Sequence, residues 1–168
     1  MKINISSLMN LISEYERKIS ELELSIHNNR LSTSIQELNG IVNVISDTKK
    51  DFDKDLNNYV DAVNKLSKMK AVLYEKNNNF KLSDGRTIQE AIVSNTYLRK
   101  LEVTYQNLIN CRSNKTRVTE VNNSYFECNN INYDPEDIEK KLEEVKKKIQ
   151  STDFEIFKLN SIEFDLDI

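Results

Sequence analysis

Apolar side chains recur at alternating gaps of three and four residues in four separate stretches of the chain. This spacing gathers them on one face of an α-helix, whereas a strand would place them on both faces. The first stretch predicts a helix over about residues 6–27, which ends before the polar run at residues 28–30. Its apolar positions are Ile5, Leu8, Ile12, Tyr15, Ile19, Leu22 and Ile26.

The second stretch predicts a helix over about residues 47–76, which ends in the Asn run at residues 77–79. Asp47 and Asp51 lie near its start, where the helix dipole favours negative charge. Its apolar positions are Phe52, Leu56, Tyr59, Val63, Leu66, Met69 and Leu73.

The third and fourth helices have clear starting signals. Thr87 and Glu90 have the spacing of a capping box, so the third helix is expected to begin after Thr87 and to reach about Asn110. Its buried face is expected at Ile88, Ala91, Ile92, Leu98, Leu101, Tyr105 and Leu108. Asp134 is a favoured N-cap, and Pro135 suits the first position of the fourth helix. Its seam to about Asn160 is Ile138, Leu142, Val145, Ile149, Thr152, Ile156 and Leu159.

Three other segments break the helical period. Residues 116–128 carry β-branched and aromatic side chains around the turn-prone pair Asn122-Asn123, which predicts a small β-hairpin. Residues 31–46 fit either a hairpin around Asn39-Gly40 or a helix, and we favour β or irregular structure. Apolar residues alternate with acidic ones at residues 161–168, which predicts an extended tail that packs through one face. The apolar residues of this tail are Ile162, Phe164, Leu166 and Ile168.

The composition agrees with long helices, because the 168 residues include only two Gly and one Pro. The net charge of −3 gives no electrostatic reason to bind nucleic acid. No secretory signal and no long apolar run is visible, so we expect a cytoplasmic protein without stable membrane insertion. Two cysteines, Cys111 and Cys128, are too few for a disulfide framework, and we expect both to be small buried residues.

Candidate chemistry is sparse. The acidic series Asp51, Asp53 and Asp55 lacks the Gly and Glu of a calcium loop, so it is interpreted as a solvated helix face. The single histidine, His27, excludes multi-histidine zinc sites, and we expect it to meet the last carbonyls of the first helix. No cofactor, metal site or catalytic group is therefore predicted.

The segment Asp84, Gly85, Arg86 and Thr87 allows two interpretations. A glycine before a helix start can present backbone amides to an anion, and the Arg86 guanidinium could clamp it. A turn followed by a helix cap accounts for the same residues without a ligand, and we favour that structural interpretation.

The C-terminal half resembles a family of small uncharacterised bacterial helical proteins, some labelled septicolysin-like. The shared features are Lys-Leu-Ser-Asp-Gly-Arg-Thr-Ile at residues 81–88, Leu98-Arg99, a β-like stretch, Ile149-Gln150, Asp153 and residues 160–163. The chain lacks the Trp residues that the family has in its hairpin and tail, and its N-terminal half matches only in helix pattern. The resemblance implies a helical core with a small β-element, no established enzyme activity and, from the label, a cytolysin.

These patterns together predict a mainly α protein with one domain over residues 1–168. Its long antiparallel helices are expected to form a coiled-coil-like bundle, with a small β-hairpin between the third and fourth helices. The narrow apolar seams suit paired long helices, so we expect a homo-oligomer, most simply a two-fold dimer. The expected function is that of a non-enzymatic scaffold or adaptor whose protein partner the sequence does not identify. The alternatives are a septicolysin-like membrane-active cytolysin and a protein that binds an anion or small ligand at residues 84–87.

Overall fold

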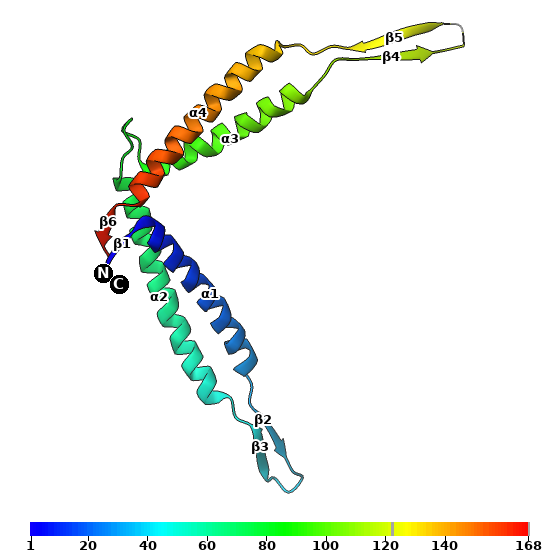
Figure 1. Cartoon of the computed structure of the whole chain (residues 1–168). Coiled ribbons are helices and arrows are strands. Elements are labelled where there is room, and N and C mark those ends of the chain that lie inside the picture. Colours follow the sequence, from blue (N-terminus) through cyan, green and yellow to red (C-terminus); the bar gives the residue numbers. More distant parts are fainter. Residues whose placement is uncertain (122, 168) are drawn as a thin grey trace. The chain divides into compact units, whose positions relative to one another are not determined.

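The chain is mainly helical, as the periodicity predicts. Its structure, a computed structural model, describes residues 1–121 and 123–167. Contacts between residues divide the chain into two compact units: Met1–Asn78 together with Asn160–Ile168, and Asn79–Leu159. Each unit is built on two neighbouring helices whose connection is a β-hairpin (Figure 1). The single bundle domain and its coiled-coil packing stay predictions.

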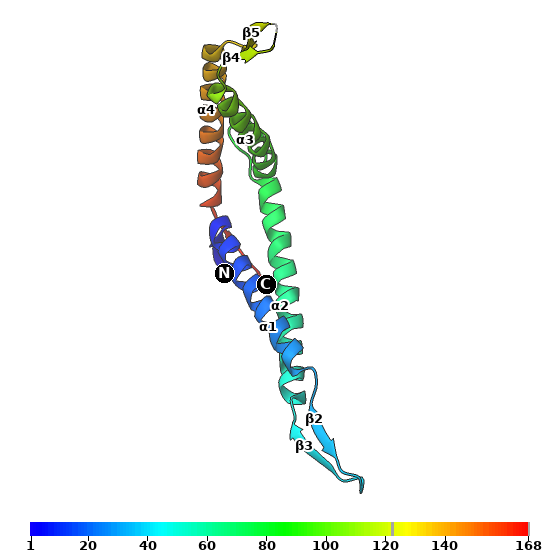
Figure 2. The ribbon, with the colours of Figure 1, turned by 90° about the vertical axis from the view of Figure 1, so that its right-hand side faces the viewer.

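The first unit pairs helix α1 (Ile5–Asn29) with helix α2 (Lys49–Asn79). The two helices run antiparallel, because polar contacts join the end of α1 to the start of α2 and earlier parts of α1 to later parts of α2. These contacts are Ser25 Oγ to Asp55 Oδ2 at 2.6 Å, Tyr59 Oη to Glu23 Oε1 at 3.0 Å and Lys70 Nζ to Glu16 Oε1 at 2.7 Å. Figure 2 shows α1 and α2 side by side from a second direction.

The α1 seam is confirmed, because each of its seven predicted positions is buried or half-buried. The α2 seam is wrong at Leu56 and Val63, which are exposed, while Asp55 and Ala62 take their places toward α1. Asp55 is tolerated there because Ser25 donates a hydrogen bond to it. Helix α2 also continues through the Asn run at residues 77–79, since Asn is a weak helix former rather than a helix breaker.

Two short strands join the ends of the chain within the first unit. Strand β1 (Lys2–Asn4) pairs antiparallel with β6 (Glu163–Asp165), with Ile3 opposite Phe164. The tail is therefore an extended segment that packs, as predicted, although Ile162 is exposed and Ile168 lies outside the described residues. Leu166 is buried in the core with Ile3, Leu8, Ile12 and Met69. The sequence did not predict β1.

The second unit pairs helix α3 (Ile88–Asn110) with helix α4 (Pro135–Asn160). The capping box at Thr87 and Glu90 is confirmed, as is Pro135 at the start of α4, where the Asp134 carboxylate accepts from the Glu136 amide. The α4 seam is confirmed in full. The α3 seam is wrong at Ile92 and Leu101, which are exposed, while polar Asn95 and Glu102 occupy the positions that face α4.

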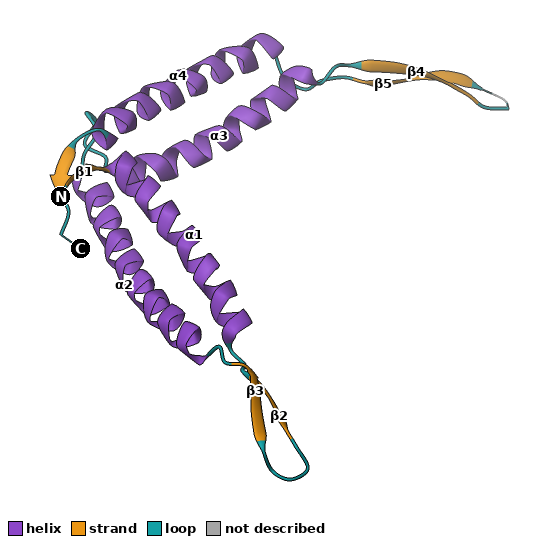
Figure 3. Ribbon diagram, turned by 60° about the horizontal axis from the view of Figure 1, so that its bottom comes forward, coloured by secondary structure: helices purple, strands orange, loops and turns teal. Residues whose placement is uncertain are grey.

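In each helical pair, a β-hairpin extends from the end at which the first helix connects to the second (Figure 3). Strands β2 (Thr33–Gln36) and β3 (Val42–Ser46) confirm the β interpretation of residues 31–46. Their turn contains Gly40 at φ +88°, a conformation that a side chain disfavours. Strands β4 (Asn114–Thr119) and β5 (Ser124–Asn129) form a longer hairpin than predicted. Of its predicted turn, Asn122 lies outside the described residues.

Candidate functional site

The turn at Asp84, Gly85, Arg86 and Thr87 is the only sequence-predicted candidate site, and its polar groups bind one another. The Asp84 carboxylate accepts from the Arg86 backbone amide at 3.0 Å and from Arg86 Nε at 2.8 Å, and it forms an ion pair with Arg86 Nη2 at 2.6 Å. The turn itself is closed by a hydrogen bond from the Gly85 amide to the Leu82 carbonyl, with Gly85 at φ +88°. Arg86 therefore holds its own turn together.

Two further carboxylates accept hydrogen bonds from Thr87 and Ser83, in and next to this turn. Glu90 accepts from the Thr87 amide at 2.8 Å, and Glu155 of α4 accepts from the Ser83 amide at 2.8 Å and from the Ser83 hydroxyl. These hydrogen bonds hold the pKa values of Glu90 and Glu155 below their usual range, as the Arg86 side chain does for the pKa of Asp84. An added anion would meet three carboxylates around one guanidinium. The geometry favours the structural interpretation.

A polar cluster that the sequence did not predict lies between α3 and α4. Asn95 is only 3% exposed, and its Nδ2 donates to Asp153 Oδ1 at 2.8 Å. Asp153 Oδ2 forms an ion pair with Arg99 Nη2 at 2.7 Å. Asn95 Oδ1 is buried without a hydrogen-bond partner among the described residues. The sequence does contain a signal for this cluster. Asn95 follows Ala91 by four residues, so it lies on the same helix face as the apolar seam of α3.

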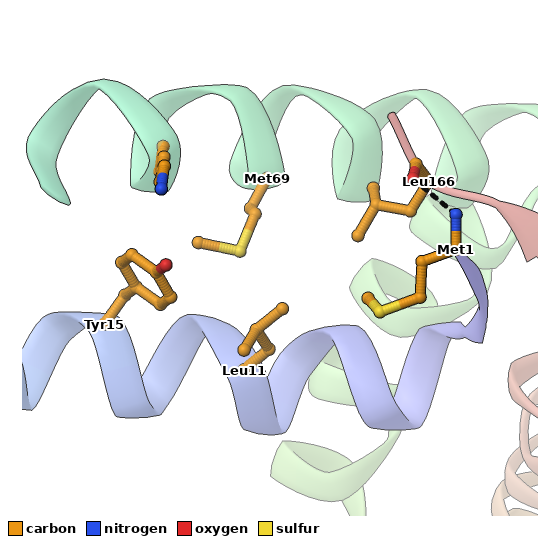
Figure 4. Close-up of a pocket in the computed structure, with 6 residues that line it drawn as sticks. Met1, Leu11, Tyr15, Met69 and Leu166 are labelled. Atoms are coloured by element: carbon orange, nitrogen blue, oxygen red, sulfur yellow. Dashed lines mark hydrogen bonds between the residues drawn. The ribbon is translucent and has the colours of Figure 1, made fainter. Parts of the chain in front are cut away.

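The first unit contains a cavity of about 220 Å³ between α1, α2 and the two chain ends. It is lined by Met1, Leu11, Tyr15, Lys65, Met69 and Leu166. Figure 4 shows Leu11 and Tyr15 from α1 facing the same space as Met69 from α2. The Met1 nitrogen donates to the Leu166 carbonyl at 3.1 Å, and the Leu166 amide donates to the Met1 carbonyl at 2.8 Å. Backbone pairing of the two chain ends thus forms one wall.

The two cysteines and the histidine differ from expectation. Cys111 and Cys128 are exposed rather than buried. Cys128 lies on β5, and a two-stranded hairpin has no second layer that could cover it, whereas Cys111 is the C-cap of α3. Burial, together with a hydrogen bond to Cys111, raises the pKa of Tyr133, whose hydroxyl donates to the Leu108 carbonyl at 2.5 Å. His27 Nδ1 lies 3.2 Å from Arg30 Nη1, instead of meeting the carbonyls at the end of α1.

Within residues 1–121 and 123–167, no group of three or more His, Cys, Asp or Glu side chains is arranged to hold a metal ion. The acidic series from Asp51 to Asp55 lies on α2, and Asp51 and Asp53 are exposed as predicted. Asp55 is half-buried and accepts a hydrogen bond from Ser25, so it is not part of a solvated face. In the same described part of the chain, no helix is both long enough and apolar enough to cross a membrane.

The fold and these sites define a class: a mainly helical protein whose helical pairs end in exposed β-hairpins. No family model and no curated protein matches the chain. A solved structure from Corynebacterium diphtheriae, described as a functionally unknown conserved protein, is similar to it with a TM-score of 0.64. The two sequences are 16% identical, and the match covers 98% of this chain and 100% of that one. The likeness shows the fold alone.

Proposed function

We propose that this protein is a non-enzymatic scaffold that self-associates through the hairpin formed by β2 and β3. The observation that carries the proposal is the exposed apolar surface of this hairpin. Six large aliphatic residues, each at least 55% exposed, belong to it: Ile35, Leu38, Ile41, Val42, Val44 and Ile45. Leu31, which is 73% exposed, precedes β2. Apolar surface of this kind, on an isolated hairpin that is marginal in water, marks an interaction site.

A second copy of the chain is the partner that this surface fits best. Glu37 is the only charged residue between positions 31 and 46, and its carboxylate accepts from the Asn39 and Asn43 side-chain amides at 3.1 Å and 3.0 Å. The hairpin therefore offers little charge with which to select an oppositely charged partner. Both of its strands have a free outer edge, and two copies of one edge can pair antiparallel about a two-fold axis.

Apolar stripes on the outer faces of two helices support the same proposal. Leu56, Val60 and Val63 on α2 are spaced four and three residues apart, so they share a helix face that is turned away from the α1 seam. Val93, Tyr97 and Leu101 form a similar exposed stripe on α3. Each helix thus has an apolar face beyond the one its partner helix covers, as expected of a protein that packs against another copy.

Anion binding at residues 84–87 is not part of the proposal, because the Arg86 guanidinium is already engaged by Asp84. A scaffold role needs no catalytic group and no cofactor. Nucleic acid is not proposed as a partner either, since the net charge of −3 would repel phosphates. The cytoplasmic location remains an expectation from the sequence.

The test is a pair of matched variants measured by light scattering after size exclusion. Val42 on β3 and Val103 on α3 are each 55% exposed, so Val42→Lys and Val103→Lys add the same charge at equal exposure. We expect Val42→Lys to reduce the measured mass to that of one chain, because a buried lysine would disrupt the contact. Val103→Lys should leave the mass unchanged. Equal masses for Val42→Lys and the unmodified protein would contradict the proposal.

A further inference from the structure

The cavity of the first unit has mainly apolar walls and a rim that carries polar groups. Leu11, Met69 and Leu166 supply aliphatic or thioether surface, and Met69 and Leu166 are almost completely buried, so they form its floor. The Leu166 amide and carbonyl are bonded to Met1, whereas the Met1 ammonium group donates one of its three hydrogens to Leu166 and can donate the others to a ligand. Figure 4 shows this space between the labelled side chains of α1 and α2. A molecule in this cavity would meet mainly carbon and sulfur atoms.

The polar groups at this cavity are cationic or neutral. Lys65 lines it from α2 and is exposed, and it forms no ion pair with a carboxylate of the described residues. A second cation lies close by, since Lys18 Nζ is 5.7 Å from the centre of the Tyr15 ring. The nearby Glu16 carboxylate is engaged by Lys70 at 2.7 Å. The rim of the cavity therefore favours a ligand with a negative charge.

We propose that this cavity binds a free medium-chain aliphatic carboxylate, with the hydrocarbon chain over Met69 and Leu11 and the carboxylate at Lys65. The cavity has a volume of about 220 Å³ and is open to solvent. At roughly 30 Å³ for each water-sized group, it accommodates about seven methylene-sized groups. Octanoate has this length. Contact of the hydrocarbon chain with the apolar lining removes apolar surface from water, which favours binding.

The proposal is independent of self-association, so either can fail alone. It is tested by titrating the full-length chain with octanoate while observing its methionine methyl groups by NMR. The chain contains three methionines, of which Met1 and Met69 line the cavity, whereas Met9 is 50% exposed and lies outside it. We expect the Met69 methyl signal to shift in a saturable manner with one octanoate per chain, and the Met9 signal to stay in place. An unshifted Met69 signal at millimolar octanoate would overturn the proposal.

Two controls address the role of the charge. Lys65→Met removes the ammonium group and keeps the apolar stem, and Lys68→Met makes the same change at an exposed position of α2 that does not line the cavity. We expect Lys65→Met to weaken octanoate binding about fivefold, as for loss of an exposed ion pair, and Lys68→Met to leave it unchanged. Octanol, which has the same chain without the charge, should bind more weakly than octanoate. Equal affinities for the two ligands would refute the assigned role of Lys65.

Discussion

Thr87 shows how far a single residue can be predicted from sequence. Its spacing from Glu90 predicts both hydrogen bonds of a capping box, and the structure contains both: the Glu90 amide donates to Thr87 Oγ1 at 3.2 Å, and the Thr87 amide donates to Glu90 Oε2 at 2.8 Å. This prediction succeeds because a helix cap depends only on residues within one turn of each other. The contact of Ser83 with Glu155, 72 residues away, leaves no such local signal.

Replacing the cap should therefore reduce stability. We expect Thr87→Ala to lower the free energy of unfolding by about 0.5–2 kcal/mol, because the Glu90 amide at the start of α3 loses its acceptor. Thr87→Ser keeps the hydroxyl and should be close to the unmodified protein. Urea denaturation measures both variants. An unchanged midpoint for Thr87→Ala would show that the cap does not stabilise α3.

Asn95 shows what periodicity misses. The period of apolar residues includes Ile92, which is exposed. It omits Asn95 because that residue is polar, although Asn95 is only 3% exposed. The position of Asn95 becomes clear only when α4 places Asp153 opposite it at 2.8 Å. Its Oδ1 remains buried without a partner among the described residues, and burial of such a group has a free-energy cost.

We accordingly expect Asn95→Leu to change the free energy of unfolding by less than about 1 kcal/mol, because removal of the unpaired buried oxygen is offset by loss of the hydrogen bond from Nδ2 to Asp153, which keeps Arg99. Asn95→Asp is the opposing variant. It would bury a second carboxylate against Asp153, and it should lower stability sharply. Both are measured by urea denaturation. A loss of stability above about 1 kcal/mol in Asn95→Leu would mean that the amide contributes more than its buried oxygen costs.

Among the elements, the helices and both hairpins are predicted from the sequence, whereas the pairing of β1 with β6 is not. The seams of α1 and α4 match their predicted positions throughout, because their periodic apolar residues are the ones that pack. Leu56, Val63, Ile92 and Leu101 fit the period equally well but are exposed, since the partner helix covers only one narrow face. The pairing of β1 with β6 joins strands of three residues from opposite ends of the chain, and so short a strand has almost no local pattern.

The contribution of the β1–β6 element can be measured at Leu166. This side chain is 4% exposed in the core of the first unit. We expect Leu166→Ala to lower the free energy of unfolding by about 2–5 kcal/mol, the usual result of truncating a buried leucine. Leu24→Ala makes the same change at a position that is 63% exposed, and it should have an effect below about 0.5 kcal/mol. Equal effects in thermal or urea unfolding would mean that the tail does not pack as described.

At the scale of the whole molecule, the sequence predicts a mainly helical chain, and the structure confirms this. Residues 84–87 form a turn before α3, as the structural interpretation predicts. The contact of Glu155 with this turn depends on α4 and has no signal in the sequence. The resemblance to septicolysin-labelled proteins stays a prediction, because the similar structure from Corynebacterium diphtheriae is described only as functionally unknown.

The proposed self-association gives the exposed apolar residues of the β2–β3 hairpin a role. Light scattering after size exclusion, over a tenfold dilution series at micromolar concentration, tests it most directly. One chain has a mass of 19.6 kDa. We expect a mass of about twice that value or a larger whole multiple, falling toward one chain only on dilution. A constant mass near 19.6 kDa over the whole series would contradict it.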